Sequence, residues 1–255
     1  MMMFSTVILA AGKGTRMKSD IVKVLHPLCG EPLLSYVVAT ARSAGSCDIS
    51  VIVGYQADAV REKFRDWGLN FIEQREQLGT GHAVLQARKR FENYTGAILI
   101  LCGDVPLLQS ATVRSLWACH EKGKTAVTVL TTVLTNSTGY GRIVKGPDGK
   151  VSRIVEERDA TEAEKKIKEI NAGIYCVNSL FLFDALSKIK NENAQQEYYL
   201  TDIVAIAHES GAGVGSLIAA DHREVMGINT PQELREAHCH MEKMKGLRGY
   251  LDENR

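Results

Sequence analysis

Short runs of β-branched and other apolar residues alternate with longer stretches whose apolar residues recur every three or four positions. The short runs predict strands, and the longer stretches predict amphipathic helices. The expected strands are Thr6–Leu9, Ile49–Val53, Asn70–Ile72, Ala97–Leu101 and Thr125–Thr131, and the expected helices are Leu33–Ser43, Ala57–Trp67, Gly81–Phe91 and Ala111–Lys122. Because such alternation is typical of strand–helix–strand crossovers, we predict an α/β fold with a mostly parallel sheet.

The pattern changes after Gly139. Two short apolar runs flank Pro147-Asp148-Gly149, which is a hairpin signal. The elements expected in this part are strands at Arg142–Lys145, Val151–Val155, Ile170–Val177 and Gly215–Ala219, a charged helix at Thr161–Lys168, helices at Leu180–Ile189 and Leu200–Glu209, and a closing helix from Pro231. No internal repeat or low-complexity linker interrupts the order, so the pattern alone predicts no sharp domain boundary.

Composition and charge narrow the class of protein. The chain has 255 residues, of which 45% are hydrophobic and 24% charged, as in ordinary soluble domains. A net charge of +1 leaves no broad basic surface for nucleic acid, so we expect any nucleotide partner to be small. The six cysteines lack paired spacing, which favours reduced thiols over disulfides or a zinc site. Without a signal-peptide pattern or a membrane-length apolar run, we expect a cytoplasmic protein with no membrane partner.

A glycine-rich turn follows the first expected strand. Glycines at Gly12 and Gly14 allow backbone N–H groups to approach an anion, and the cations Lys13, Arg16 and Lys23 can neutralise it. The turn therefore predicts phosphate binding, although glycines and cations also occur in ordinary surface turns. It is neither a P-loop nor a dinucleotide fingerprint, because it lacks the Gly-Lys-Ser/Thr ending and the third glycine that those motifs need.

An aspartate follows another expected strand. Asp104 comes directly after Gly103, where a carboxylate with waters and phosphate oxygens suits Mg²⁺. An aspartate that caps the next turn is the alternative interpretation.

Gln74 lies between the third expected strand and a helix. Its amide offers one donor and one acceptor side by side, as the imide edge of uracil requires, but an isolated glutamine is more often a surface residue. His82, in the first turn of that helix, is a candidate acid or base or a structural residue.

Seven segments, in order, carry a resemblance to a known family. They are Leu-Ala-Ala-Gly-Lys-Gly-Thr-Arg-Met (9–17), Gln-Leu-Gly-Thr-Gly-His-Ala (77–83), Gly-Asp-Val-Pro-Leu (103–107), Thr-Gly-Tyr-Gly-Arg-Ile (138–143), Ile-Val-Glu (154–156), Glu-Ile-Asn-Ala-Gly-Ile (169–174) and Glu-Tyr-Tyr-Leu-Thr-Asp (197–202). From Val7 to about Asn229 the chain resembles the bacterial N-acetylglucosamine-1-phosphate uridyltransferases. The first segment indicates only the sugar nucleotidyltransferase superfamily, and the later ones narrow it to this sugar.

The resemblance implies a Rossmann-like three-layer nucleotidyltransferase fold that makes UDP-N-acetylglucosamine and pyrophosphate from UTP and N-acetylglucosamine 1-phosphate. It implies that Arg16, Lys23 and Asp104 act in catalysis, with Mg²⁺ on Asp104 and Asn229. The implied nucleotide-binding residues are Leu9, Ala10, Ala11, Gly12, Lys13, Gly14, Gln74, Gly79, Thr80 and Gly103, and the implied sugar-binding residues are Gly141, Glu156, Asn171, Tyr199 and Thr201. The sugar-phosphate oxygen would attack the α-phosphorus in line, with no covalent enzyme intermediate.

The sequence departs from the family pattern at two positions and at its end. Val22 stands where a proline usually precedes the lysine, which predicts a less rigid placement of Lys23. Gln196 replaces a glycine before Glu197-Tyr198-Tyr199. We expect a nucleotidyltransferase domain at 1–229 and a helical linker-like tail at 230–255. The hexapeptide repeat of a left-handed β-helix is missing from the sequence, so uridylyl transfer without acetyl transfer or acetyl-CoA is expected.

Two other functions remain open at this point. One is a related nucleotidyltransferase that uses another sugar phosphate or another base. The other is a sugar-nucleotide-binding protein that keeps the pocket and has lost turnover. Release of pyrophosphate would indicate a nucleotidyltransferase, and binding of the sugar nucleotide without release would indicate the binding protein.

Overall fold

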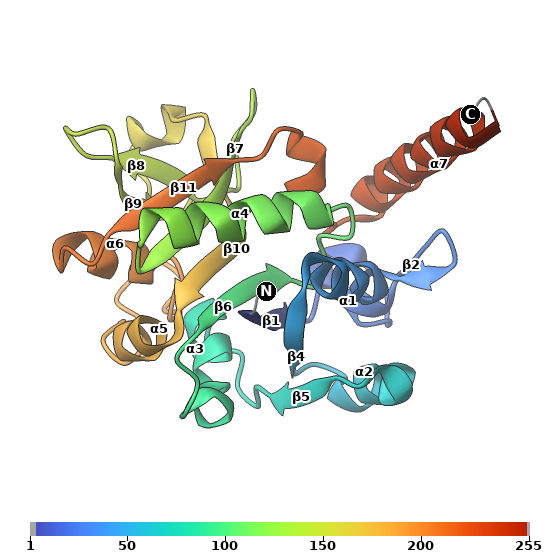
Figure 1. Ribbon diagram of the computed structural model, residues 1–255, viewed down its shortest axis with the longest axis horizontal. Helices are drawn as coiled ribbons and strands as arrows, with labels where there is room; N and C mark the ends of the chain where they lie inside the picture. Colours follow the sequence, from blue (N-terminus) through green and yellow to red (C-terminus); the bar gives the residue numbers. More distant parts are fainter. Residues whose placement is uncertain (1–3, 254–255) are drawn as a thin grey trace.

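The structure is a computed structural model that describes residues 4–253 (Figure 1). The strands are β1 (Phe4–Ala10), β2 (Pro27–Leu28), β3 (Glu31–Pro32), β4 (Ser46–Val53), β5 (Asn70–Glu73), β6 (Ala97–Cys102), β7 (Val127–Val133), β8 (Arg142–Lys145), β9 (Val151–Val155), β10 (Glu169–Asn178) and β11 (Val214–Ile218). The helices are α1 (Leu33–Ala44), α2 (Ala57–Lys63), α3 (Thr80–Leu85), α4 (Ser110–Gly123), α5 (Ser179–Leu186), α6 (Asp202–Glu209) and α7 (Pro231–Glu253). Within residues 4–253, no helix combines the length and the apolar character that a membrane span requires.

One large mixed sheet forms the centre of the molecule. Its main order is β11-β7-β10-β6-β1-β4-β5, and β8 and β9 extend it as a hairpin beside β10. Four of the six neighbouring pairs in that order are parallel, and the two antiparallel pairs are those of β10 with β6 and β7. The predicted mostly parallel sheet is therefore confirmed.

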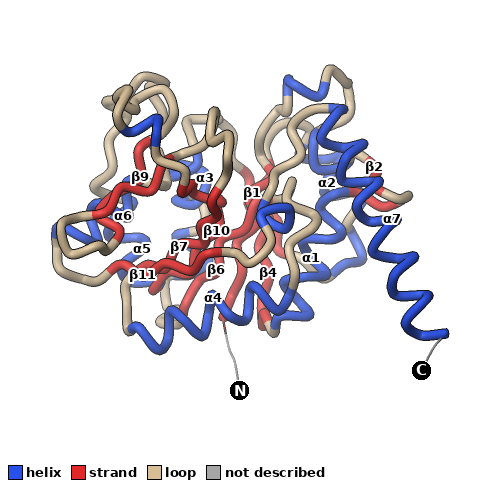
Figure 2. Tube along the Cα trace, turned by 90° about the horizontal axis from the view of Figure 1, so that it is seen from above, coloured by secondary structure: helices blue, strands red, loops and turns tan. Residues whose placement is uncertain are grey.

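Helices cover both faces of the sheet, which gives three layers (Figure 2). Helices α1 and α4 pack on one face, and α3, α5 and α6 pack on the other. Consecutive residues of β1 and β6 point to opposite faces: Ile8 and Leu99 join one core, and Val7 and Ile100 join the other. Strands buried on both faces are expected to be continuous apolar runs, as these are.

The prediction of a charged helix at Thr161–Lys168 is wrong. Only Glu164–Lys166 form a short 3-10 helix. The Glu164 side chain accepts hydrogen bonds from the Thr161 backbone N–H (2.8 Å) and hydroxyl (2.7 Å), and it also pairs with Arg153. These local side-chain bonds offer the backbone an alternative to a continued helix.

Two other expected helices end early. Helix α2 ends at Lys63, and α3 ends at Leu85; each is followed by a separate 3-10 helix. Gly68, with φ of 60°, closes the 3-10 helix after α2. The helical spacing of apolar residues continues past the ends of both helices, because the 3-10 helices that follow also place side chains in the core. Phe91 is one of these buried side chains.

The topology places two turns side by side. Strands β1 and β6 are parallel neighbours, so the turns after Ala10 and Cys102 open at the same edge of the sheet. Ligands of open α/β sheets bind at such carboxyl ends. Helix α7 begins nearby with a capping box, in which the Thr230 hydroxyl accepts from the Glu233 N–H and the Glu233 carboxylate accepts from the Thr230 N–H.

Candidate functional site

A cavity of about 330 Å³ lies at the carboxyl ends of β1 and β6. The predicted residues that line it are Leu9, Ala10, Ala11, Gly12, Lys23, Gln74, Gly79, Thr80 and Asp104. Gly103 lies directly beneath, where a Cβ would come within 3.1 Å of both the Leu9 carbonyl oxygen and the Val24 side chain. The structure thus brings together most of the residues assigned to the nucleotide.

The glycine-rich turn is held by backbone bonds to neighbouring segments. Gly103 N–H donates to the Leu9 carbonyl (2.9 Å), and Tyr55 N–H donates to the Ala11 carbonyl (3.1 Å). Gly14 has φ of 65°, and a Cβ there would lie 2.6 Å from the Lys23 Cβ. Gly14 therefore serves the close approach of Lys23, whereas a Cβ on Gly12 would meet no protein atom within 4 Å.

The cations of the turn lie in different places. Lys13 is turned onto the Tyr55 ring, with its Nζ 5.4 Å from the ring centroid, and it does not line the cavity. Arg16 donates from Nη2 to the Asn229 Oδ1 (3.0 Å). Of the three cations, only Lys23 lines the cavity, and a phosphate-binding role for Lys13 and Arg16 stays a prediction.

Lys23 joins the two predicted metal ligands. Its Nζ donates to the Asp104 carboxylate and to the Asn229 Oδ1 (3.0 Å). Asn229 is fixed by its N–H, which donates to the Glu233 Oε2 (2.7 Å) in the α7 capping box. Because the Asp104 carboxylate meets the Lys23 ammonium, we find no support for the turn-capping interpretation of Asp104.

These residues fit a magnesium ion with few protein ligands. Oxygens of Asp104 and Asn229 both meet the Lys23 Nζ, so they converge on a point that a cation favours. Mg²⁺ commonly takes one or two protein oxygens and completes its octahedron with waters and phosphate oxygens. Among residues 4–243, whose side chains the structure describes, no cluster of three or more His, Cys, Asp or Glu side chains offers a metal site built from protein alone.

Val22 does not loosen Lys23 as the sequence suggested. Val22 is fully buried, and its N–H donates to the Gln56 Oε1 (3.0 Å), a bond that proline could not make. Gln196 has φ of 56°, in the left-handed region where glycine is favoured. The two departures therefore differ, because one is accommodated by a hydrogen bond and the other is strained.

Gln74 is not a surface residue, since its relative exposure is 3%. Its Nε2 lies 3.1 Å from the Gly79 carbonyl oxygen and 3.0 Å from the His82 Nδ1. Both amide hydrogens are thus engaged by protein, which leaves Oε1 as the group available to a ligand. Gly79 has φ of 111°, and a Cβ at this position would lie only 2.6 Å from the Tyr198 carbonyl oxygen, so only glycine fits there.

Two of the five residues assigned to the sugar, Glu156 and Tyr199, line a second cavity of about 390 Å³. Thr201 does not line it, but its hydroxyl donates to the Glu156 Oε1 (3.1 Å). A Cβ on Gly141 would lie 3.4 Å from the Glu156 Oε2, so the absence of a side chain leaves that carboxylate open. Asn171 N–H donates to the Gly141 carbonyl (2.9 Å).

Asn171 and Tyr199, like Glu156 and Thr201, have protein partners. Asn171 donates from Nδ2 to the Tyr175 hydroxyl (2.7 Å) and accepts from the Gly173 N–H (2.9 Å). The Tyr199 hydroxyl lies 3.2 Å from the Asp159 Oδ2. Asn171 is thereby fixed beside Gly141, with one amide hydrogen left for a ligand.

The two cavities differ in their charged groups. The first is lined by Lys23, a cation that suits phosphates. The second has side chains of both signs on its lining, since Arg153 and Lys190 accompany its carboxylates. Burial raises the pKa of Glu156, and burial together with the charge of Asp159 raises the pKa of Asp202 to about 6.

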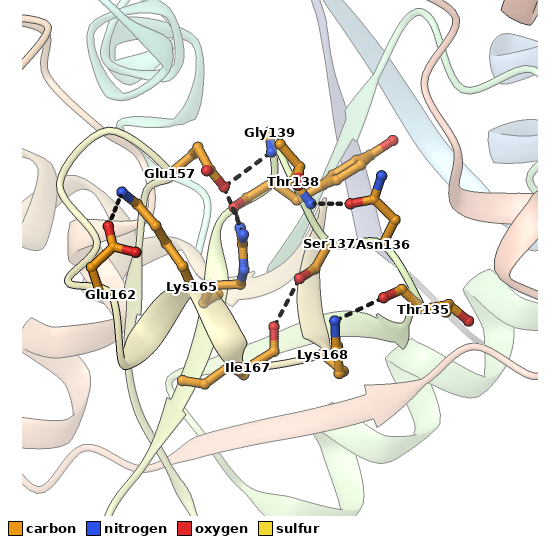
Figure 3. A network of polar contacts seen from close by, with 12 residues as sticks. Thr135, Asn136, Ser137, Thr138, Gly139, Glu157, Glu162, Lys165, Ile167 and Lys168 are labelled. Atoms are coloured by element: carbon orange, nitrogen blue, oxygen red, sulfur yellow. Dashed lines mark hydrogen bonds and ion pairs between the residues drawn. The ribbon is translucent and has the colours of Figure 1, made fainter.

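A polar network holds the loop that leads to Gly141 (Figure 3). Arg142, whose side chain is only 1% exposed, donates to the Glu157 Oε2 (2.6 Å) and to the Tyr140 carbonyl. The same carboxylate accepts from the Gly139 N–H (3.0 Å). Since Glu157 follows Glu156, this ion pair ties the loop to the strand that presents Glu156.

Five lining residues of the first cavity had no role predicted from the sequence, namely Val24, Gln77, Ala83, Cys102 and Glu197. Cys102 precedes Gly103 at the end of β6, and Gln77 and Glu197 open segments that were already assigned. Their places next to assigned residues were the available signal. Burial raises the pKa of the Cys102 thiol to about 12, so this group is not a ready nucleophile.

Comparison with known proteins bears on this geometry. Residues 6–146, more than half of the chain, match the MobA-like NTP transferase domain. The chain belongs to the NTP transferase family. The curated relatives include the "Bifunctional protein GlmU" of Geobacter metallireducens, which is 53% identical over 91% of this chain and 49% of the relative. That of Brevibacillus brevis is 49% identical over 93% of this chain and 51% of the relative.

This NTP transferase spans about half the length of the curated relatives that it matches. A crystal structure of UDP-glucose pyrophosphorylase complexed with UDP-glucose has a TM-score of 0.75, with 17% identity, 95% coverage of this chain and 100% of that chain. The structural likeness supports the three-layer fold, and the family match supports nucleotidyl transfer.

Proposed function

We propose that this chain transfers the uridylyl group of UTP to N-acetylglucosamine 1-phosphate, forming UDP-N-acetylglucosamine and pyrophosphate in a Mg²⁺-dependent reaction. The observation that carries the proposal is the convergence of Lys23, Asp104 and Asn229 beside a cavity that also contains Gln74. A base-reading amide and a phosphate-binding cluster thus share one cavity. The later segments of the sequence resemblance, such as Glu-Ile-Asn-Ala-Gly-Ile (169–174), support the choice of sugar.

The protein's part in the reaction is positioning and charge stabilisation. Lys23 and Arg16 bind the phosphates and neutralise the charge that moves onto pyrophosphate as it leaves. Asp104 and Asn229 would hold Mg²⁺, which when bound screens phosphate charge and aligns the phosphates for in-line attack. The attacking group is an oxygen of the sugar phosphate, so the protein need supply no nucleophile.

The second cavity, beside Glu156, would receive the sugar. Glu156, held by Thr201, can accept hydrogen bonds from sugar hydroxyls, and Asn171 can donate its remaining amide hydrogen to the N-acetyl carbonyl. Gly141 leaves room for the ring beside Glu156. We also propose a cytoplasmic location, which fits the unpaired thiols of all six cysteines.

Pyrophosphate release tests the proposal. The purified chain is assayed with Mg²⁺ and each of four nucleoside triphosphates against N-acetylglucosamine, glucose and mannose 1-phosphates. We expect the highest kcat/KM for UTP with N-acetylglucosamine 1-phosphate, and loss of turnover with EDTA. A preference of about tenfold or more for another pair would contradict the assignment. Binding of UDP-N-acetylglucosamine without any release would favour the non-catalytic alternative.

A further inference from the structure

We propose that His82 is a positioning residue that fixes the amide of Gln74 and so makes the site select uracil over cytosine. The inference rests on the proposed function, because it takes the base to be bound at Gln74. It assigns a role to a histidine that the uridylyl transfer reaction itself does not use.

The orientation of the Gln74 amide follows from its partners. The Gly79 carbonyl oxygen, 3.1 Å away, can only accept, so the amide group must turn its nitrogen toward it. The second hydrogen of that nitrogen then points to the His82 Nδ1 at 3.0 Å. His82 therefore accepts at Nδ1 and carries its proton on Nε2, a tautomer assigned from this network.

Protein contacts hold His82 in place. It lies in the first turn of α3, where the Gln86 Nε2 donates to the His82 carbonyl (3.0 Å). The Gln86 Nε2 is also 3.1 Å from the ring Nε2. With the ring proton on Nε2, the amide of Gln86 turns its oxygen to that proton and gives up the bond to the His82 carbonyl, which the half-buried Gln86 can do more readily than the buried Gln74. The helix is fixed by Gly81, whose N–H donates to the Tyr198 carbonyl (2.8 Å).

The fixed amide leaves one group for the base. Among the residues that the structure describes, the Gln74 Oε1 makes no hydrogen bond, and Gln74 lines the cavity. Uracil carries a hydrogen on N3 and can donate to this oxygen. Cytosine has a lone pair at N3, which the oxygen repels. Turning the Gln74 amide over would suit cytosine, but it would set Oε1 against the Gly79 carbonyl and the His82 Nδ1.

Two substitutions separate the acceptor atom from the bulk of the ring. His82→Phe keeps an aromatic ring and removes the acceptor, while His82→Asn places a side-chain oxygen near the position of Nδ1. We expect His82→Phe to lower the ratio of kcat/KM for UTP to that for CTP by roughly tenfold. His82→Asn should restore the ratio to within about threefold of wild type, and the KM for the sugar phosphate should stay unchanged in both.

A double-mutant cycle tests whether His82 acts through Gln74. Because the amide is the link, adding His82→Phe to Gln74→Ala should change the ratio no further. A ratio unchanged by His82→Phe in a folded enzyme, as judged by its melting temperature, would overturn the inference and leave the proposed function intact. An additive effect of the two substitutions would overturn it as well. A wild-type enzyme without preference for UTP would instead contradict the proposed function, and the inference with it.

Discussion

The ion pair between Arg142 and Glu157 provides a quantitative prediction. In Glu157→Ala, the guanidinium of Arg142, 1% exposed, loses its only carboxylate partner among the described residues and keeps the Tyr140 carbonyl. Its Nε is already buried without a partner, so the remaining bonds cannot compensate. Removing one partner of a buried ion pair typically costs about 3–5 kcal/mol. Because the Glu157 side chain is 29% exposed, water can enter its place, and we expect the lower end, about 3 kcal/mol.

Urea denaturation of wild type and Glu157→Ala at neutral pH measures this loss. A loss of about 3 kcal/mol should lower the melting temperature by about 6–12 °C for a chain of this size. The matched control is Glu162→Ala in the same region, since Glu162 pairs with Lys165 and is 87% exposed (Figure 3). Because that pair is exposed to solvent, its loss should change the stability far less than the loss of Glu157.

The pH dependence gives an independent check. The Gly139 N–H, and then Arg142, lower the pKa of Glu157 below its usual value. A carboxyl group with a lowered folded pKa stabilises the protein above the unfolded pKa, and this contribution is lost as the pH falls through the folded pKa. The difference between wild type and Glu157→Ala should therefore shrink in acid. A loss below about 1 kcal/mol at neutral pH, or a difference that persists in acid, would show that the Arg142–Glu157 ion pair does not stabilise the fold in this way.

Three further predictions concern the site and its surroundings. Asp104→Asn should lower kcat by about 100-fold or more with the melting temperature nearly unchanged, because a metal ligand contributes several kcal/mol to charge stabilisation. Asp148→Asn, in the exposed hairpin turn, is the control. Comparable rates for both variants would exclude the metal role of Asp104. Gln196→Gly should stabilise the fold by about 1 kcal/mol, since it relieves the left-handed backbone of that residue; a loss of stability on urea denaturation would contradict this. Burial and the charge of Asp159 raise the pKa of Asp202 to about 6, so ionisation disfavours folding as the pH rises through that range. Asp202→Asn should therefore raise the melting temperature more at about pH 8 than at about pH 5, and equal shifts would show that the carboxylate is well solvated.

The sheet and the position of the site could be predicted from the sequence, because both follow from local patterns of apolar and polar residues. Apolar runs such as Ala97–Cys102 are buried on both faces, and the polar residues just beyond them, such as Asp104, must then lie at the carboxyl edge of the sheet. The helix breaks after Lys63 and Leu85 lay outside this reasoning, because 3-10 helices preserve the apolar spacing.

Other features depend on contacts between distant segments. The sequence alone gives no sign that Gln74 is buried, since its partner Gly79 and the Tyr198 segment meet it only after folding. Lys13 turns onto Tyr55 because that ring comes from a neighbouring strand end. Arg142 is charged and would be placed at the surface from its residue type, but Glu157 allows it to be buried.

We propose that one cavity at the carboxyl edge of the sheet binds the uridine nucleotide between Gln74 and the Lys23–Asp104–Asn229 cluster. A crystal structure with UDP-N-acetylglucosamine and Mg²⁺ would locate the nucleotide. We expect the uracil N3 within hydrogen-bond distance of the Gln74 Oε1, the diphosphate beside Lys23, and the sugar against Glu156. Nucleotide bound at any other place, or with its base away from Gln74, would contradict it.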